Sequence, residues 1–498
     1  MSTGLERAVA RLRGRAGPLE VYLDRRVFAI LLLGFAAGLP LLLVLRTLSA
    51  WLAEDGIDTT TIGLFGFVMA PYTLKFLWAP LMDRLPLPVL SAAFGRRRSW
   101  LLLTQACLIA AIFGLGQTDP GQDLFLTALM ALLVAFCSAS QDIVIDAYRI
   151  EILEEHQLGA GSANYVTGYR IGMWVAAAGA LYLADVAGWS VAYTAMALLM
   201  LVGVATVLLN PEPAPPPPDS ALEPPAAAGG RRQLGILLLL AAALGAFTGL
   251  LLGAGFGARA GWLGGIAVAA VLAALSTVFG HSPAFRQAVV EPFRDFLVRN
   301  GLAVALVILA FISLFKASDV LLTLMANPFY LEIGFSKSQI AWVSGTFGLI
   351  VTFIGSYLAG TLIYRIGILP GLWIGGVLMM ASNLMFALLA WVGASYPLFH
   401  VVILVENVSG GMGTTAFVAY LASLCNRRYT AVQYALLTSF MQMFGKFVVV
   451  PGSGFLVAAL GWINFFVLST LAGLPALALL WWLGRHVHAP LPAAAPAE

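Results

Sequence analysis

Charged side chains recur inside segments of this chain that are otherwise apolar and long enough to span a bilayer. They are Arg46, Lys75, Asp142, Asp146, Arg149, Arg170, Lys316, Asp319, Glu406 and Lys446. A charge at the bilayer centre costs about 3 kcal/mol or more, so it is retained where it lines a polar path or pairs across helices. We therefore expect these residues to carry most of the functional chemistry.

Two acids in the first half share one helical face. Asp142 and Asp146 are four residues apart, and Arg149 continues the stripe. Repulsion between close carboxylates favours protonation of one of them, which a proton-coupled carrier requires. The alternative is an ion-pair cluster with Arg149 at the inner end of the segment.

The second half contains its own set of embedded charges. Lys316 and Asp319 are spaced to pair within one helix or to face one cavity. Glu406 lies near the middle of a later segment, with Asn407 beside it. We expect Asp319 or Glu406 to bind the coupling proton, with Lys316 as a switch; a static Lys316–Asp319 pair is the alternative.

Embedded cations suit a substrate with carboxylates. Arg170 and Lys446 lie near mid-span at equivalent positions of the two halves, and Lys75 is a third cation, one helical turn after Tyr72. Arginine can bind a carboxylate through two parallel hydrogen bonds. The alternative is that each cation neutralises an acid of its own half. Arg46 lies toward the end of its segment, where it can reach the membrane interface.

The composition requires a membrane protein with many spans. The 498 residues are 60% hydrophobic and 10% charged, with a net charge of +3. An all-α polytopic fold with fourteen transmembrane helices is predicted, near residues 27–50, 60–82, 99–117, 124–148, 160–184, 190–209, 234–255, 262–280, 300–330, 338–363, 369–392, 398–424, 432–459 and 461–484. The 3 cysteines and 5 histidines form no evident disulfide framework or metal site, and no nucleophile–base pair stands out. We therefore expect no enzyme and no cofactor.

Arginines alternate between successive loops and so predict the orientation. One set of loops contains Arg84, Arg96–Arg98, Arg365 and Arg427–Arg428, whereas the other set is acidic. The basic set is expected in the cytoplasm, with both termini. The predicted units are a basic N-terminus (1–26), a six-helix bundle (27–209), a Pro-rich linker (210–233), an extra transmembrane hairpin (234–280), a connector (281–299), a second six-helix bundle (300–485) and a cytoplasmic tail (486–498).

The loop after the second span carries a recognisable motif. Asp83-Arg84 is followed by Gly95 and Arg96-Arg97-Arg98. This resembles, with an insert, the Asp-Arg-x-Gly-Arg-Arg element of major facilitator transporters, whose fold is two related six-helix halves. We expect Asp83, Arg84, Arg96 and Arg97 to act in gating; a purely topogenic basic loop is the alternative.

Longer strings make the resemblance more specific. They include residues 34–41, 75–84, 138–147, 168–173 and 406–419, and they resemble AmpG-type muropeptide permeases of the major facilitator superfamily. The resemblance implies a proton-driven inner-membrane importer of N-acetylglucosaminyl-1,6-anhydro-N-acetylmuramic acid, with or without peptide. In that family, import serves peptidoglycan recycling and beta-lactamase induction, and so antibiotic resistance. The substrate contacts expected are at Lys75, Gln141, Tyr169, Arg170, Asn407 and Lys446.

Two other functions share this fold and remain open at this point. One is an assembly factor for pigment–protein complexes, which would lack a continuous polar path. The other is a carrier of another bulky anionic conjugate, such as a coenzyme A derivative. We expect a monomer with a small sugar–peptide substrate, the lipid bilayer as its surroundings and no nucleic-acid partner.

Overall fold

The structure is a computed structural model that describes residues 20–214, 290–444 and 450–486. These residues form helices and short connections, without strands. The chain divides into a compact unit of Met1–Ala214 with Leu306–Glu498, and a second unit of Pro215–Ala305. In the second unit the described part begins with α17 (Glu291–Asn300), in which Arg294 pairs with Glu291 one turn earlier.

The prediction of an all-helical membrane protein is confirmed. Within the described residues, 10 helices are long and apolar enough to cross a membrane. They are Arg25–Glu54, Arg96–Gly116, Leu124–Ile152, Glu155–Ala187, Trp189–Leu209, Leu302–Glu332, Lys337–Ile366, Ile368–Val392, Tyr396–Ser423 and Leu456–His486. The predicted hairpin at 234–280 and part of the span at 432–459 lie outside the described residues, so the count of fourteen stays a prediction.

Glycines bring the first and fifth spans together in the N-terminal bundle. In α2 (Arg25–Leu42), a Cβ on Gly38 would lie 2.0 Å from the Tyr169 carbonyl oxygen of α10 (Leu158–Trp174). From the other side, a Cβ on Gly168 would lie 2.0 Å from the Leu31 carbonyl oxygen. Only glycine allows two helix backbones to approach so closely. This crossing fixes the stretch of α10 that carries Tyr165, Tyr169 and Arg170.

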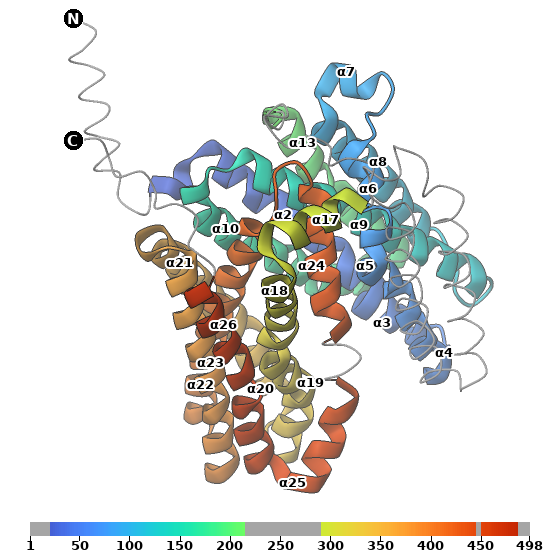
Figure 1. The fold of residues 1–498 in the computed structure, drawn as a ribbon. Helices are drawn as coiled ribbons and strands as arrows, with labels where there is room; N and C mark the ends of the chain where they lie inside the picture. Colours follow the sequence, from blue (N-terminus) through green and yellow to red (C-terminus); the bar gives the residue numbers. More distant parts are fainter. Residues whose placement is uncertain (1–19, 215–289, 445–449, 487–498) are drawn as a thin grey trace, which may run out of the picture. The chain divides into compact units, whose positions relative to one another are not determined.

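The span predicted at 60–82 is divided into short helical segments. It consists of α4 (Thr59–Leu64), η3 (Phe65–Met69), α5 (Ala70–Leu74), η4 (Lys75–Leu77) and α6 (Ala79–Arg84). Pro71 and Pro80 stand in the first turns of α5 and α6, where a missing N–H is tolerated. The remaining α-helices of this bundle are α3 (Leu48–Glu54), α7 (Leu90–Phe94), α8 (Arg96–Gly116), α9 (Leu124–Ile152), α11 (Ala180–Ala187), α12 (Trp189–Leu199) and α13 (Leu201–Leu209). Helix α9 packs beside η3, α5 and α6 of the second span, and α8 packs on α9 (Figure 1).

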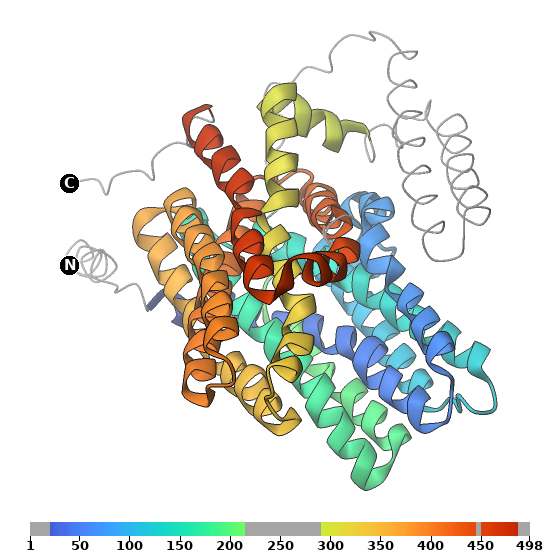
Figure 2. The ribbon, with the colours of Figure 1, turned by 90° about the horizontal axis from the view of Figure 1, so that it is seen from below.

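The C-terminal bundle repeats the pattern of long helices. It contains α18 (Leu302–Phe315), α19 (Ala317–Glu332), α20 (Lys337–Ile340), α21 (Gly348–Ile366), α22 (Ile368–Val392), α23 (Tyr396–Ser423), α24 (Thr430–Phe444), α25 (Val450–Leu471) and α26 (Leu474–His486). Helix α25 is interrupted at Gly461, whose φ is 72°. In Figure 2, the orange helices α21, α22 and α23 run side by side.

Helices of the two bundles touch at one end of the molecule. Helix α10 packs on α21, where a Cβ on Gly360 would lie 3.1 Å from Ala163. Helix α24 packs on α9, α6 and α5, and Arg427 donates to the Leu153 carbonyl oxygen over 3.1 Å. We call this the basic end, because Arg97, Arg365 and Arg427 belong to the helices and turns that meet there.

Candidate transport site and gate

A first cluster of charges joins the bundles near the middle of their helices. Its members are Arg170 of α10, Lys316 and Asp319 where α19 begins, Thr352 of α21, and Glu406, Asn407 and Thr414 of α23. Lys316 Nζ lies 3.1 Å from Asp319 Oδ2 and 2.7 Å from Thr414 Oγ1. The predicted Lys316–Asp319 pair is therefore present. We call this set the central cluster.

The two cations of the central cluster face the same acids. Glu406 interacts electrostatically with Asp319, Arg170 and Lys316, and Arg170 interacts with Asp319 and Glu406. Arg170 Nη1 also donates across the bundle boundary to Thr352 Oγ1 over 3.3 Å. The Lys316 and Asp319 side chains keep 16% and 27% of their surface exposed, so the cluster is not fully buried in the protein.

A second, drier cluster lies in the N-terminal bundle. Lys75 Nζ is 3.8 Å from Asp146 Oδ2, and Arg149 Nη2 is 3.4 Å from Asp146 Oδ1. All three side chains are at most 6% exposed. The neighbouring Asp142 Oδ1 is buried without a hydrogen-bond partner in the described part of the chain. The ion pair of Asp146 with Arg149, which was the alternative to proton binding, is present. Proton binding by Asp142 or Asp146 stays a prediction.

Arg149 reaches from this cluster to the other bundle. Its Nη2 donates to Tyr434 Oη of α24 over 2.9 Å, and Nη1 donates to Ser162 over 3.0 Å. The guanidinium also lies over the rings of Tyr165 and Tyr434, 4.9 and 5.3 Å from their centroids. A cation–π contact of a desolvated guanidinium contributes up to about 2 kcal/mol. We call Lys75, Asp142, Asp146, Arg149, Tyr165 and Tyr434 the Arg149 cluster.

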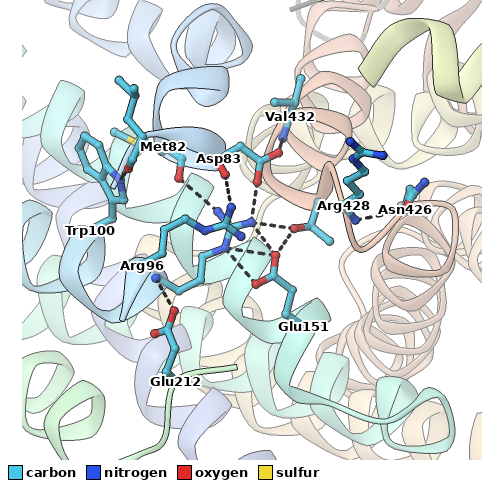
Figure 3. A network of polar contacts seen from close by, with 12 residues as sticks. Met82, Asp83, Arg96, Trp100, Glu151, Glu212, Asn426, Arg428 and Val432 are labelled. Atoms are coloured by element: carbon cyan, nitrogen blue, oxygen red, sulfur yellow. Dashed lines mark hydrogen bonds and ion pairs between the residues drawn. The ribbon is translucent and has the colours of Figure 1, made fainter. Parts of the chain in front are cut away.

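A third cluster closes the basic end (Figure 3). Arg97 Nη2 lies 2.5 Å from both Asp83 Oδ1 and Glu151 Oε1, and it donates to Thr430 Oγ1 over 3.0 Å. Thr430 in turn donates to Glu151, and the Val432 N–H donates to Asp83 Oδ2 over 3.4 Å. Two carboxylates thus face the first turn of α24, where backbone N–H groups attract negative charge. We call Asp83, Arg97, Glu151, Thr430 and Val432 the Arg97 cluster.

The residues predicted for gating have different roles here. Arg97 is the centre of the cluster, whereas Arg96 donates through Nη1 to the Asp83 carbonyl oxygen over 2.5 Å. The Arg84 side chain lies outside what the structure describes. Glu151 and Glu212 were not among the predicted site residues, although an acid near a basic loop indicates a partner for an ion pair or for backbone N–H groups.

Glu212 holds the start of the linker against α8. Its carboxylate accepts from the N–H groups of Arg97 and Arg98 over 2.7 and 3.0 Å, which satisfies two of the orphan donors of the first helical turn. The Tyr148 hydroxyl donates to the Pro211 carbonyl oxygen over 2.9 Å. These bonds position the turn from which the Arg97 side chain extends.

A further contact at the basic end uses a tyrosine outside the membrane spans. The Tyr22 hydroxyl donates to the Tyr357 carbonyl oxygen over 3.3 Å, and the two rings meet edge to face. Burial raises the pKa of Tyr22 to about 12. The hydroxyl therefore remains a donor at physiological pH.

The predicted substrate contacts are not all in one place. Arg170 and Asn407 belong to the central cluster. Lys75 belongs to the Arg149 cluster, and Tyr169 interacts electrostatically with Asp142 and Asp146 of that same cluster. Gln141 is fully buried and donates to the Ala36 carbonyl oxygen of α2 over 3.0 Å. Lys446 lies outside the described residues. Substrate contact by each of these residues stays a prediction.

Comparison with known proteins places this arrangement in a family. Residues 27–326 match the family model described as Major Facilitator Superfamily. The chain belongs to the major facilitator superfamily. This superfamily consists of transporters, and the prediction that the chain is not an enzyme agrees with membership.

Relatives within the superfamily show which group of transporters the chain resembles. The chain is 36% identical over 464 residues to the anhydromuropeptide permease of Escherichia coli K12, covering 93% of this chain and 80% of the permease. It is 30% identical to putative transporter AmpG 4 of Rickettsia conorii, covering 94% and 99%. The predicted resemblance to AmpG-type permeases is therefore confirmed.

Solved structures support the fold alone. The proton:xylose symporter XylE aligns with a TM-score of 0.58 at 13% identity, covering 94% of this chain and 96% of XylE. The human organic anion transporter MFSD10 aligns with a TM-score of 0.55 at 16% identity, covering 91% and 98%. Both agree with the major facilitator fold of this transporter.

Proposed function

We propose that this transporter imports anhydromuropeptides from the periplasm to the cytoplasm, driven by the proton gradient across the bacterial inner membrane. The substrate would be N-acetylglucosaminyl-1,6-anhydro-N-acetylmuramic acid, with or without its peptide. The observation that carries the proposal is the central cluster, in which cations of both bundles meet acids of the C-terminal bundle, with Lys316 and Asp319 partly exposed. The 36% identity to a protein named anhydromuropeptide permease supports the substrate class.

The cluster has the chemistry that such a substrate needs. Arg170 and Lys316 can hold carboxylates, and the amide and hydroxyl groups nearby can bind sugar and peptide groups. Glu406 and Asp319 are acids that a proton can neutralise inside the membrane. Lys75, Tyr169 and Asn407 remain the further proposed contacts.

The arrangement of charges also supports a direction. If the basic end faces the cytoplasm, as arginine-rich loops favour, the Arg97 and Arg149 clusters close the cytoplasmic side. The exposed part of the central cluster would then be reached from the periplasm. Import would require both clusters to open toward the cytoplasm after substrate and proton have bound.

The deciding experiment is transport by the purified protein in liposomes. Labelled anhydromuropeptide should accumulate when the outside is acidic, and a protonophore should abolish accumulation. Asp319→Asn should remove accumulation while leaving a folded protein. Uptake that ignores the proton gradient contradicts the coupling.

The same assay separates the other two functions. An assembly factor would give no uptake. A carrier of another anionic conjugate would show uptake of that conjugate that unlabelled anhydromuropeptide does not inhibit.

A further inference from the structure

A chain of hydrogen bonds links the two bundles through Thr352, a residue that has no role in the proposal above. It runs from Arg170 of α10 to Thr352 of α21, and from there to Asn407 and Glu406 of α23. Arg170 Nη1 donates to Thr352 Oγ1 over 3.3 Å, Thr352 donates to Asn407 Oδ1 over 2.9 Å, and Asn407 Nδ2 donates to Glu406 Oε2.

The surroundings of Asn407 fix the direction of the last bond in this chain. Asn407 Nδ2 also donates to the Ile403 carbonyl oxygen over 3.0 Å, so the nitrogen of the amide faces Glu406 and the oxygen faces Thr352. A hydroxyl has one proton and two lone pairs. If the Thr352 proton goes to Asn407, its lone pairs face Arg170; the competing acceptor is the Gly348 carbonyl oxygen at 2.8 Å.

Close helix packing holds Thr352 in this place. Thr352 is 0% exposed, and a Cβ on Gly411 of α23 would lie 2.5 Å from its carbonyl oxygen. A Cβ on Gly348 would lie 3.3 Å from Asn407 Nδ2. Gly411 thus serves the close approach of α23 to α21, and α23 is continuous through it.

When the Thr352 proton goes to Asn407 and not to the Gly348 carbonyl oxygen, each donor in the chain points from the cation toward the carboxylate. Hydrogen bonds aligned in this way polarise one another, and those with charged ends are the strongest. A proton on Glu406 removes the negative end. A carboxylate of the substrate on Arg170 occupies the positive end. Either event weakens the hydrogen bond from Arg170 to Thr352, which joins the two bundles.

We propose that Thr352 is a positioning residue that couples substrate binding at Arg170 to protonation at Glu406 through the Thr352–Asn407 relay. The inference rests on the proposed function, because it assumes that a proton and a substrate carboxylate share the central cluster. It adds a residue that contacts neither the proton nor the substrate. Its physical basis is the Arg170–Thr352 bond across the bundle boundary.

Transport by three variants tests the relay. Thr352→Val keeps the shape but loses the hydroxyl, and Thr352→Ser keeps the hydroxyl. The ratio of proton-driven accumulation to substrate exchange should fall at least tenfold in the valine variant and recover in the serine variant. Thr415→Val is the matched control, because Thr415 is 0% exposed and its Oγ1 has no partner in the described part of the chain. A wild-type ratio in Thr352→Val, or equal loss in Thr352→Ser, overturns the proposal.

A second measurement needs no substrate. The carboxyl band of Glu406, assigned by its loss in Glu406→Gln, can be titrated by infrared difference spectroscopy. Arg170, Lys316, Asp319 and Tyr330 also face this carboxylate and are unchanged in the variants. Thr352→Val removes the hydrogen-bond chain that ends on the Glu406 carboxylate. The midpoint of the Glu406 titration should therefore move upward by about one pH unit in this variant. If the Glu406 midpoint is the same in Thr352→Val as in the wild-type protein, the relay is overturned. If the midpoint moves but the wild-type protein takes up no anhydromuropeptide, only the proposed substrate is overturned.

Discussion

Removing the charge of Arg97 should open the basic end. The guanidinium is 1% exposed and lies 2.5 Å from two carboxylates, those of Asp83 and Glu151, which are 1% and 6% exposed. In Arg97→Gln both carboxylates stay buried without their cation whenever α24 covers them. When the basic end opens, water solvates the two carboxylates, and the free-energy cost of burying them without a cation disappears.

The size of the effect follows from this burial. Breaking a buried ion pair by removing one partner costs about 3–5 kcal/mol. We expect the low end of this range, because the first turn of α24 still offers N–H groups, including that of Val432. A cost of about 3 kcal/mol corresponds to a shift of roughly 10²-fold from the closed toward the open state.

Cross-linking across the basic end can measure this shift. His156 and Tyr364 belong to different bundles, and their ring centroids are 6.1 Å apart. In a chain whose native cysteines are replaced by serine, cysteines at these two positions should cross-link rapidly with a short bifunctional reagent. Arg97→Gln should lower the cross-linked fraction at fixed time.

A variant that also removes the two carboxylates separates the effect of the lost Arg97 charge from the effect of its lost packing. In the triple variant Asp83→Asn, Arg97→Gln, Glu151→Gln, no carboxylate of the cluster remains unpaired, so most of the cross-linking should return. If Arg97→Gln cross-links like the parent chain, buried charge does not control closure and the reasoning fails. If the triple variant is as open as the single one, lost packing is the cause instead.

Three further outcomes follow from the same contacts. Glu406→Gln should abolish accumulation but not folding, which uptake and thermal unfolding in detergent together can check; wild-type accumulation would reject a coupling role. Tyr434→Phe keeps the ring but loses the bond from Arg149, so the closed state should weaken by about 1.5–3 kcal/mol, read by the same cross-linking. Gly411→Ala should destabilise the fold, because the new Cβ would lie 2.5 Å from the α21 backbone, whereas Gly410→Ala, which meets nothing within 4 Å, should unfold at the parent temperature; equal unfolding temperatures would refute the packing argument.

Pairs within one helix could be predicted from the sequence because helix geometry alone determines them. Asp146 with Arg149 and Lys316 with Asp319 are each three residues apart, and both pairs are present. Their partners across bundles could not be predicted in this way. Contacts such as Arg149 with Tyr434, 285 positions apart, depend on how two bundles pack.

The second span shows a different limit. Its hydrophobicity predicts a crossing, but not that the helix breaks around η3 and η4. Pro71 and Pro80 were available signals, because proline removes a backbone donor and begins helices better than it continues them. The break matters for the site, since Lys75 begins η4 and points to Asp146 from there.

The distribution of charge is consistent with the proposed binding and release of substrate and proton. Among the described residues, the Arg149 cluster contains two cations and two acids, and so does the central cluster with Arg170, Lys316, Asp319 and Glu406. A balanced set of buried charges is tolerable, whereas one unpaired charge is expensive. A substrate carboxylate entering the central cluster unbalances it by one negative charge, and a proton on Glu406 or Asp319 restores the balance. In the proposed cycle, neutrality thus favours moving the proton and the anionic substrate together, and the partly exposed central cluster is the place where this exchange would cost least.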